Sequence, residues 1–232
     1  MMIETIAFDA DDTLWHNERI FISAKEKFTA LLANYHEPDW IEARLDETES
    51  RNIAHFGYGI KGFTLSMIET AIELTEGRVT GDEITWIIAN ARQMMTSPID
   101  LLPGVVETVA KLADNYRLMI ITKGDLFDQE TKIARSGLGD YFESVEIVSE
   151  KHPAAYEQIL KRHGVIPERF VMVGNSLKSD VLPVIEIGGE AVHIPYETEW
   201  FHDRVDASEL DGKKYQTLQR ISDIPDWLTS RT

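Results

Sequence analysis

Hydrophobic positions follow a helical pattern through the first part of this chain. Between residues 16 and 98, apolar side chains recur every three or four positions, which places them on one face of successive α-helices. The clearest stripes are Phe21, Ala24, Phe28, Leu31, Leu32 and Tyr35; then Ile60, Phe63, Met67, Ala71 and Leu74; then Ile84, Ile87, Ile88, Ala91 and Met94. A weaker stripe over residues 40–56 completes a series of four helices, which predicts a small bundle.

The pattern changes after Pro103. Short apolar runs now alternate with longer helical stretches, as expected for strands and helices of a parallel sheet covered on both faces. The predicted strands are residues 5–8, 117–122, 145–148, 169–174 and 190–194, and the predicted helices between them are 105–113, 128–136, 154–162 and 180–187. We therefore predict an α/β protein with a Rossmann-like parallel sheet core, helices on both faces, and an all-helical cap inserted after the first strand. The expected core covers residues 1–15 and 99–232, and the expected cap covers 16–98.

Composition narrows the possible partners and the location. The 232 residues carry 23 Lys and Arg against 40 Asp and Glu, a net charge of −17, which argues against nucleic acid as a non-specific partner and against anionic membrane surfaces. There is no cysteine, so thiolate nucleophiles and cysteine-ligated zinc are excluded. No apolar stretch approaches the roughly 20 residues of a membrane span, and we see no secretory leader. We expect a cytoplasmic protein with no membrane partner; the sequence leaves its oligomeric state open.

One glycine motif has a misleading form. Residues 57–62, GYGIKG, match the G-x-G-x-x-G pattern of dinucleotide-binding loops. That pattern functions where it follows a strand and opens a helix, whereas here it falls between two predicted helices. We interpret it as a joint between helices. The alternative is a mobile loop over a substrate, formed with Phe56, Tyr58 and Lys61.

Four other motifs follow predicted strands, at the edge where open α/β sheets bind ligands. They are FDADDTL at residues 8–14, IITKGD at 120–125, Lys151, and VGNSLKSD at 173–180. Carboxylates two residues apart can supply a nucleophile and an acid/base. A hydroxyl followed by glycine suits a phosphate oxygen, and oxygen-bearing side chains after a strand suit a hard cation. Each motif alone also fits an ordinary turn, so their shared position is the stronger signal.

Together, in this order, the motifs resemble the haloacid dehalogenase superfamily of aspartate-nucleophile hydrolases. The resemblance implies that Asp9 attacks phosphorus and that Asp11 protonates the leaving oxygen and then activates water. Thr122, Lys123 and Lys151 are expected to hold the phosphoryl oxygens. Lys151 is also expected to screen Asp9 and, together with the metal, to help relieve the repulsion between the two aspartates.

The resemblance further implies a Mg²⁺ site. Its expected ligands are Asp9, the backbone carbonyl of Asp11, and the fourth motif through Asn175 and Asp180. The family usually has aspartate where this chain has Asn175. An amide oxygen brings no charge, so we expect weaker metal binding and a possible direct role for Asp180.

The predicted function is a Mg²⁺-dependent phosphatase that hydrolyses a small phosphorylated metabolite. A 2-haloacid dehalogenase-like hydrolase is an alternative with the same nucleophile, but the family's dehalogenases lack the second aspartate, so Asp11 argues for phosphate. A phosphomutase on the same scaffold stays open. A non-catalytic binding or regulatory protein is the alternative of another class, and Asn175 is the feature that favours it.

Overall fold

A computed structural model of the protein describes residues 2–198 and 200–231. Its contacts divide the chain into two compact units. We call them the core unit, made of Met1–His16, Ile99–Lys123 and Gln129–Thr232, and the helical unit, made of Asn17–Pro98 and Gly124–Asp128. The core range expected from the sequence includes residues 1, 199 and 232, which lie outside the described residues.

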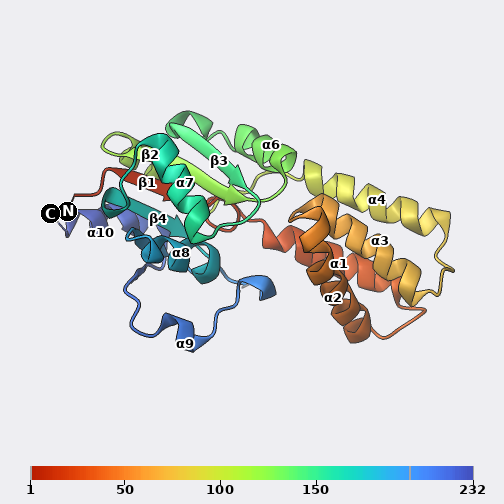
Figure 1. The fold of residues 1–232 in the computed structure, drawn as a ribbon. Helices are drawn as coiled ribbons and strands as arrows, with labels where there is room; N and C mark the ends of the chain where they lie inside the picture. The colour runs from red at the N-terminus through yellow and green to blue at the C-terminus, as the bar shows by residue number, and fades with distance from the viewer. Residues whose placement is uncertain (1, 199, 232) are drawn as a thin grey trace. The chain divides into compact units, whose positions relative to one another are not determined.

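The core unit is built on a parallel sheet, which confirms the predicted fold class. In the described part of the chain the sheet has six strands in the order β3-β2-β1-β4-β5-β6, all neighbours being parallel (Figure 1). The strands are β1 Thr5–Phe8, β2 Arg117–Lys123, β3 Ser144–Val148, β4 Phe170–Gly174, β5 Glu190–His193 and β6 Gln216–Thr217. The sequence analysis did not predict β6, because two polar residues carry no hydrophobic signal.

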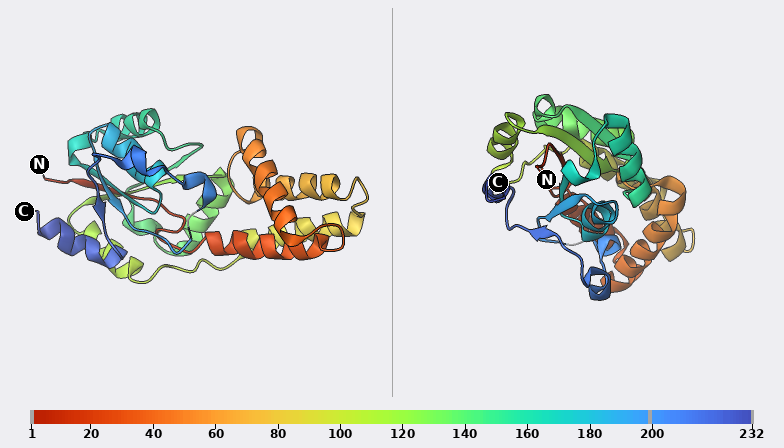
Figure 2. Two further views of the ribbon diagram at one scale, coloured as in Figure 1. Left: turned by 90° about the horizontal axis from the view of Figure 1, so that it is seen from below. Right: turned by 60° about the vertical axis from the view of Figure 1, so that its left-hand side comes forward.

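Helices cover both faces of this sheet, as predicted (Figure 2). They are α5 Val105–Ala113, α6 Leu126–Ser136, α7 Pro153–His163, α8 Leu182–Glu186 and α10 Ile224–Thr229. The short α9, Ala207–Leu210, lies in the segment between β5 and β6 and has no buried residue. Alternate strand residues point to opposite faces. Ile6 and Phe8 of β1 pack in the same cluster as Val109 of α5, whereas Ala7 packs with Tyr156 of α7 on the other side.

The helical unit contains α1 Glu18–Leu32, α2 Pro38–Phe56, α3 Ile60–Leu74 and α4 Gly81–Thr96. The predicted stripes meet in its core, where Phe28, Phe63 and Ile87 are almost fully buried. The GYGIKG segment joins α2 to α3 with no strand before it, so the prediction of a joint between helices is confirmed. Of the helices in the described residues, none has the length and apolar character needed to cross a bilayer.

The strand register brings the predicted motifs to one edge of the sheet. Phe8, the last residue of β1, pairs with Ile120 of β2 on one side and with Val173 of β4 on the other. Because the strands are parallel, the segments that follow them leave the sheet at the same edge. Segments separated by more than 100 residues in the chain therefore meet there.

Candidate active site

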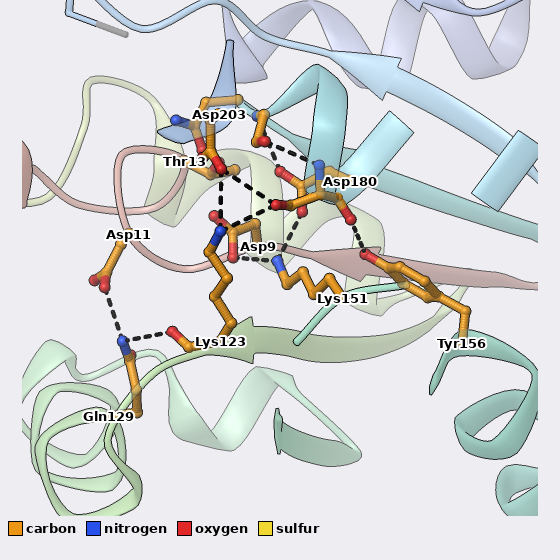
Figure 3. A network of polar contacts seen from close by, with 12 residues as sticks. Asp9, Asp11, Thr13, Lys123, Gln129, Lys151, Tyr156, Asp180 and Asp203 are labelled. Carbon is orange, nitrogen blue, oxygen red and sulfur yellow. Dashed lines mark hydrogen bonds and ion pairs between the residues drawn. The ribbon is translucent and has the colours of Figure 1, made fainter. Parts of the chain in front are cut away.

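A buried lysine links two of the predicted carboxylates. The Nζ of Lys151 lies 2.5 Å from Oδ1 of Asp9 and 2.7 Å from Oδ1 of Asp180 (Figure 3). Asp9 directly follows β1, Lys151 precedes α7, and Asp180 lies in a turn of π-helix, Leu177–Val181, that follows β4. Three motifs thus contribute one side chain each to a single cluster.

The burial of this cluster sets its charges. Burial raises the pKa of Asp9 to about 7; the Lys151 ammonium opposes the rise, and the Asp180 carboxylate adds to it. Burial alone would lower the pKa of Lys151, but the two carboxylates outweigh it and the pKa is raised. Lys151 therefore stays charged, and its one ammonium is shared between the two carboxyl groups.

The Asp180 carboxylate is held on both oxygens. Its Oδ2 accepts a hydrogen bond of 3.0 Å from the backbone N–H of Ser176, while Oδ1 accepts from Lys151. The hydroxyl of Tyr156 donates to the carbonyl of Ser179, in the same turn, at 3.0 Å. Burial raises the pKa of Tyr156 well above its ordinary value, so the hydroxyl keeps its proton. Asp180 is thus placed to fix Lys151 against Asp9.

Asn175 faces a group of oxygens. With its amide nitrogen turned toward them, it donates to the backbone carbonyl of Asp11 at 3.2 Å, to Oδ2 of Asp9 at 3.3 Å and to Oγ1 of Thr13 at 3.2 Å. With its amide oxygen turned the same way, only the Thr13 hydroxyl can donate to it, at 3.2 Å. The second orientation gathers one carboxylate oxygen and two carbonyl oxygens around a point. These are hard ligands of the kind that Mg²⁺ takes, so the donor set fits that ion.

The Asp11 carboxylate faces a cation that the sequence analysis did not name. Lys132 Nζ lies 2.7 and 2.8 Å from its two oxygens, Gln129 Nε2 donates to Oδ2 at 2.8 Å, and Trp15 Nε1 donates to Oδ1 at 2.7 Å. Lys151 lies against Asp9 and Asp180, so it screens the first of the two aspartates, and Lys132 pairs with the second. The sequence analysis missed Gln129 and Lys132, although their spacing of three on the helix after the second motif was a usable signal.

Two residues of the second motif, Thr122 and Lys123, have different surroundings. Thr122 is buried at the end of β2. The ammonium of the next residue, Lys123, donates to Oγ of Ser179 at 3.1 Å and pairs with Asp203 at 3.0 Å. It also lies 5.2 Å from the ring centre of Trp200. Asp203 and Trp200 come from the segment that follows β5.

Comparison with known proteins identifies the class of this site. The model of the haloacid dehalogenase-like hydrolases matches residues 3–188, and the chain belongs to this family. The resemblance found in the four motifs is thereby confirmed. A solved haloacid dehalogenase-like family hydrolase from Xanthomonas campestris is 42% identical, with a TM-score of 0.88 over 98% of this chain and 91% of that one.

The relatives include enzymes whose names describe the removal of phosphate, and two of them serve as examples. The glyceraldehyde 3-phosphate phosphatase of Methanothermobacter thermautotrophicus is 26% identical over 237 residues, covering 96% of this chain and all of the relative. The pyrimidine 5′-nucleotidase YjjG of Escherichia coli is 26% identical over 205 residues, covering 81% of this chain and 84% of the relative. The two names share a phosphomonoester and differ in the rest of the substrate.

Proposed function

We propose that this hydrolase is a Mg²⁺-dependent phosphatase that acts on a small phosphorylated metabolite. The observation that carries the proposal is the buried Lys151 ammonium, which pairs with Asp9 and Asp180 at the edge of the sheet. A nucleophilic carboxylate that must meet an anionic phosphoryl group needs such a compensating charge. The names of the relatives support the same substrate class.

The proposed reaction proceeds through an aspartyl-phosphate. An oxygen of Asp9 attacks phosphorus, and Asp11 gives a proton to the leaving oxygen as the P–O bond breaks. Water then attacks the phosphorus, Asp11 takes its proton, and inorganic phosphate leaves Asp9. In this proposal Thr122, Lys123 and Lys151 bind the phosphoryl oxygens.

The proposed metal ligands are Oδ2 of Asp9, the carbonyl of Asp11 and the amide oxygen of Asn175. Mg²⁺ held there would neutralise charge on the phosphoryl group as a Lewis acid. Both oxygens of Asp180 already accept hydrogen bonds, so we assign it a supporting role through Lys151 and Ser176.

We also propose that the chain divides into a catalytic core and a helical cap. Residues 1–15 and 99–232 would form the catalytic core, and residues 16–98 the cap. The support is the contact division, which separates Asn17–Pro98 from the flanking segments but groups Gly124–Asp128 with the helices. A cytoplasmic location is proposed on the absence of cysteine, which fits a reducing compartment.

A metal-dependent turnover assay tests the function. Hydrolysis of p-nitrophenyl phosphate is measured with Mg²⁺, with a chelator, and after Mg²⁺ is restored, with Asp9→Asn as the control for contaminating phosphatases. We expect activity that needs both Mg²⁺ and Asp9. Activity on a 2-haloacid without metal would support the dehalogenase alternative instead, and no turnover of either substrate would favour a binding protein.

A substrate panel then addresses specificity. Glyceraldehyde 3-phosphate, a pyrimidine nucleoside monophosphate and several sugar phosphates are compared by kcat/KM. Free inorganic phosphate is the expected product in every active case. Transfer of the phosphoryl group to a second position of a sugar would support the phosphomutase alternative.

A further inference from the structure

Several side chains contact the Asp11 carboxylate directly. Lys132 contacts both of its oxygens, Gln129 donates to one and Trp15 donates to the other. Figure 3 shows the carboxylate directed toward Gln129. The side chain of Lys132 is 10% exposed and that of Asp11 is 22% exposed, so solvent screens this ion pair only in part.

The groups that hold Asp11 come from α6 on one side and from the turn after β1 on the other. Gln129 and Lys132 lie one turn apart on α6, and Gln129 also donates to the backbone carbonyl of Lys123 at 3.4 Å, at the end of β2. On the other side, the N–H of Asp12 donates to the carbonyl of Trp15 at 2.7 Å, which closes the turn that carries Asp11. Helix, strand end and turn therefore hold one carboxylate.

The contacts of Lys132 and Gln129 fix the direction of the Asp11 carboxylate. The Lys132 ammonium lies within hydrogen-bond distance of both carboxylate oxygens, at 2.7 and 2.8 Å, and Gln129 donates to one of them. In the proposed function, Asp11 must meet the water that attacks the aspartyl-phosphate in a defined orientation.

We propose that Lys132, assisted by Gln129, is a positioning residue that holds the Asp11 carboxylate for the hydrolysis of the aspartyl-phosphate. This inference rests on the proposed function. In that step an O–P bond forms from water, the bond between Asp9 and phosphorus breaks, and the proton of the water passes to an Asp11 oxygen. Lys132 itself touches neither the phosphoryl group nor the water.

The proposal has a kinetic signature that a purely structural role lacks. With p-nitrophenyl phosphate, whose leaving group needs little protonation, kcat/KM reports formation of the aspartyl-phosphate, whereas kcat includes its hydrolysis. We expect Lys132→Met to lower kcat by about a hundredfold, the loss typical of a catalytic group displaced by about 1 Å. KM should fall in parallel, so that kcat/KM stays close to that of the unmodified enzyme.

Rapid mixing supplies the second readout. Lys132→Met should release a burst of p-nitrophenolate equal to the enzyme concentration, with phosphate retained on Asp9. Lys132→Arg keeps a cation beside Asp11 and should recover much of kcat. Gln129→Leu, which leaves the ion pair in place, should show the same split between kcat and kcat/KM to a smaller degree, and it keeps the test available if Lys132→Met folds poorly.

Lys111→Met is the matched control, because it removes the same charge from an exposed position on α5. It should leave both constants unchanged. An equal fall in kcat and kcat/KM without a burst in both Lys132→Met and Gln129→Leu would overturn the positioning role. If the unmodified enzyme and Asp11→Asn both turn over without any phosphate on Asp9, the proposed function itself fails, and this inference fails with it.

Discussion

Gly174 and Asp180 are packed so closely that a methyl group on Gly174 would lie 2.1 Å from Oδ2 of Asp180 and 2.7 Å from its Cβ. No side chain other than hydrogen fits there without moving the carboxylate. Asp180 is fully buried and holds Lys151, so any displacement reaches the ammonium beside Asp9. The last residue of β4 thus controls the geometry of a residue six positions later.

We predict that Gly174→Ala removes most of the phosphatase activity and lowers the free energy of unfolding by about 1–3 kcal/mol, the usual range for overpacking. Urea denaturation and p-nitrophenyl phosphate turnover measure the two effects. Gly139→Ala is the control, because a Cβ there meets no atom within 4 Å. Normal activity in Gly174→Ala would mean that the placement of Asp180 does not matter for catalysis.

Removing Lys151 should damage the fold as well as the activity. Lys151→Met leaves Asp9 and Asp180 as buried carboxylates without their shared cation, and breaking a buried pair in this way costs about 3–5 kcal/mol. Adding Asp180→Asn to this variant removes one of the two charges. It should restore part of the unfolding free energy and none of the activity, so that stability and catalysis separate in a single pair of measurements.

Asn175 offers a test of the proposed metal ligands. Asn175→Asp places a formal negative charge beside Oδ2 of Asp9 and the carbonyl of Asp11, where a divalent cation would relieve the repulsion. The Mg²⁺ concentration that gives half of the maximal rate should therefore fall. The maximal rate itself need not rise, because the added carboxylate also repels the phosphate. An unchanged midpoint would place this residue outside the coordination of the metal.

A buried glutamate should make the helical unit sensitive to pH. Burial raises the pKa of Glu49 to about 7; the Lys25 ammonium, 3.8 Å away, opposes this and Asp46 adds to it. The folded protein therefore binds this proton more tightly than the unfolded chain, whose glutamates titrate in the ordinary range near 4.3. By linkage, stability falls as the pH rises from about 4.5 to about 7.

Glu49→Gln should abolish that loss. At pH 4 the two proteins should differ little, because Glu49 is then largely protonated in the folded and in the unfolded state. At pH 8 the variant should be more stable by about 3 kcal/mol, since the pKa of Glu49 rises from 4.5 to about 7 and one pKa unit corresponds to about 1.4 kcal/mol. Thermal unfolding at both pH values measures the difference. A variant that is less stable at pH 8 would show that the contact with Lys25 outweighs the burial of the charge.

Much of the fold could be predicted because its signals are local. The strand Thr5–Phe8 and the helix Val105–Ala113 begin and end where the hydrophobic pattern placed them. In contrast, α10 and β6 lie in a tail whose pattern is short and mixed, so their formation depends on packing. Ile224 and Leu228 of α10 are buried only because the distant α5 presents an apolar face to the same cluster.

For the site, the sequence by itself determined the chemical groups and the edge of the sheet at which they gather. Motif type and strand position are properties of short segments, and parallel strands carry them to the same edge. The resemblance already placed Lys151 with Asp9, but only the tertiary structure showed that Asp180 shares this lysine and that Lys132 serves Asp11. Lys151 pairs with Asp9 across 142 positions of the chain, and Lys132 pairs with Asp11 across 121. Such choices depend on how helices dock on the sheet, because ion pairs need contact within a few ångströms that no local pattern encodes.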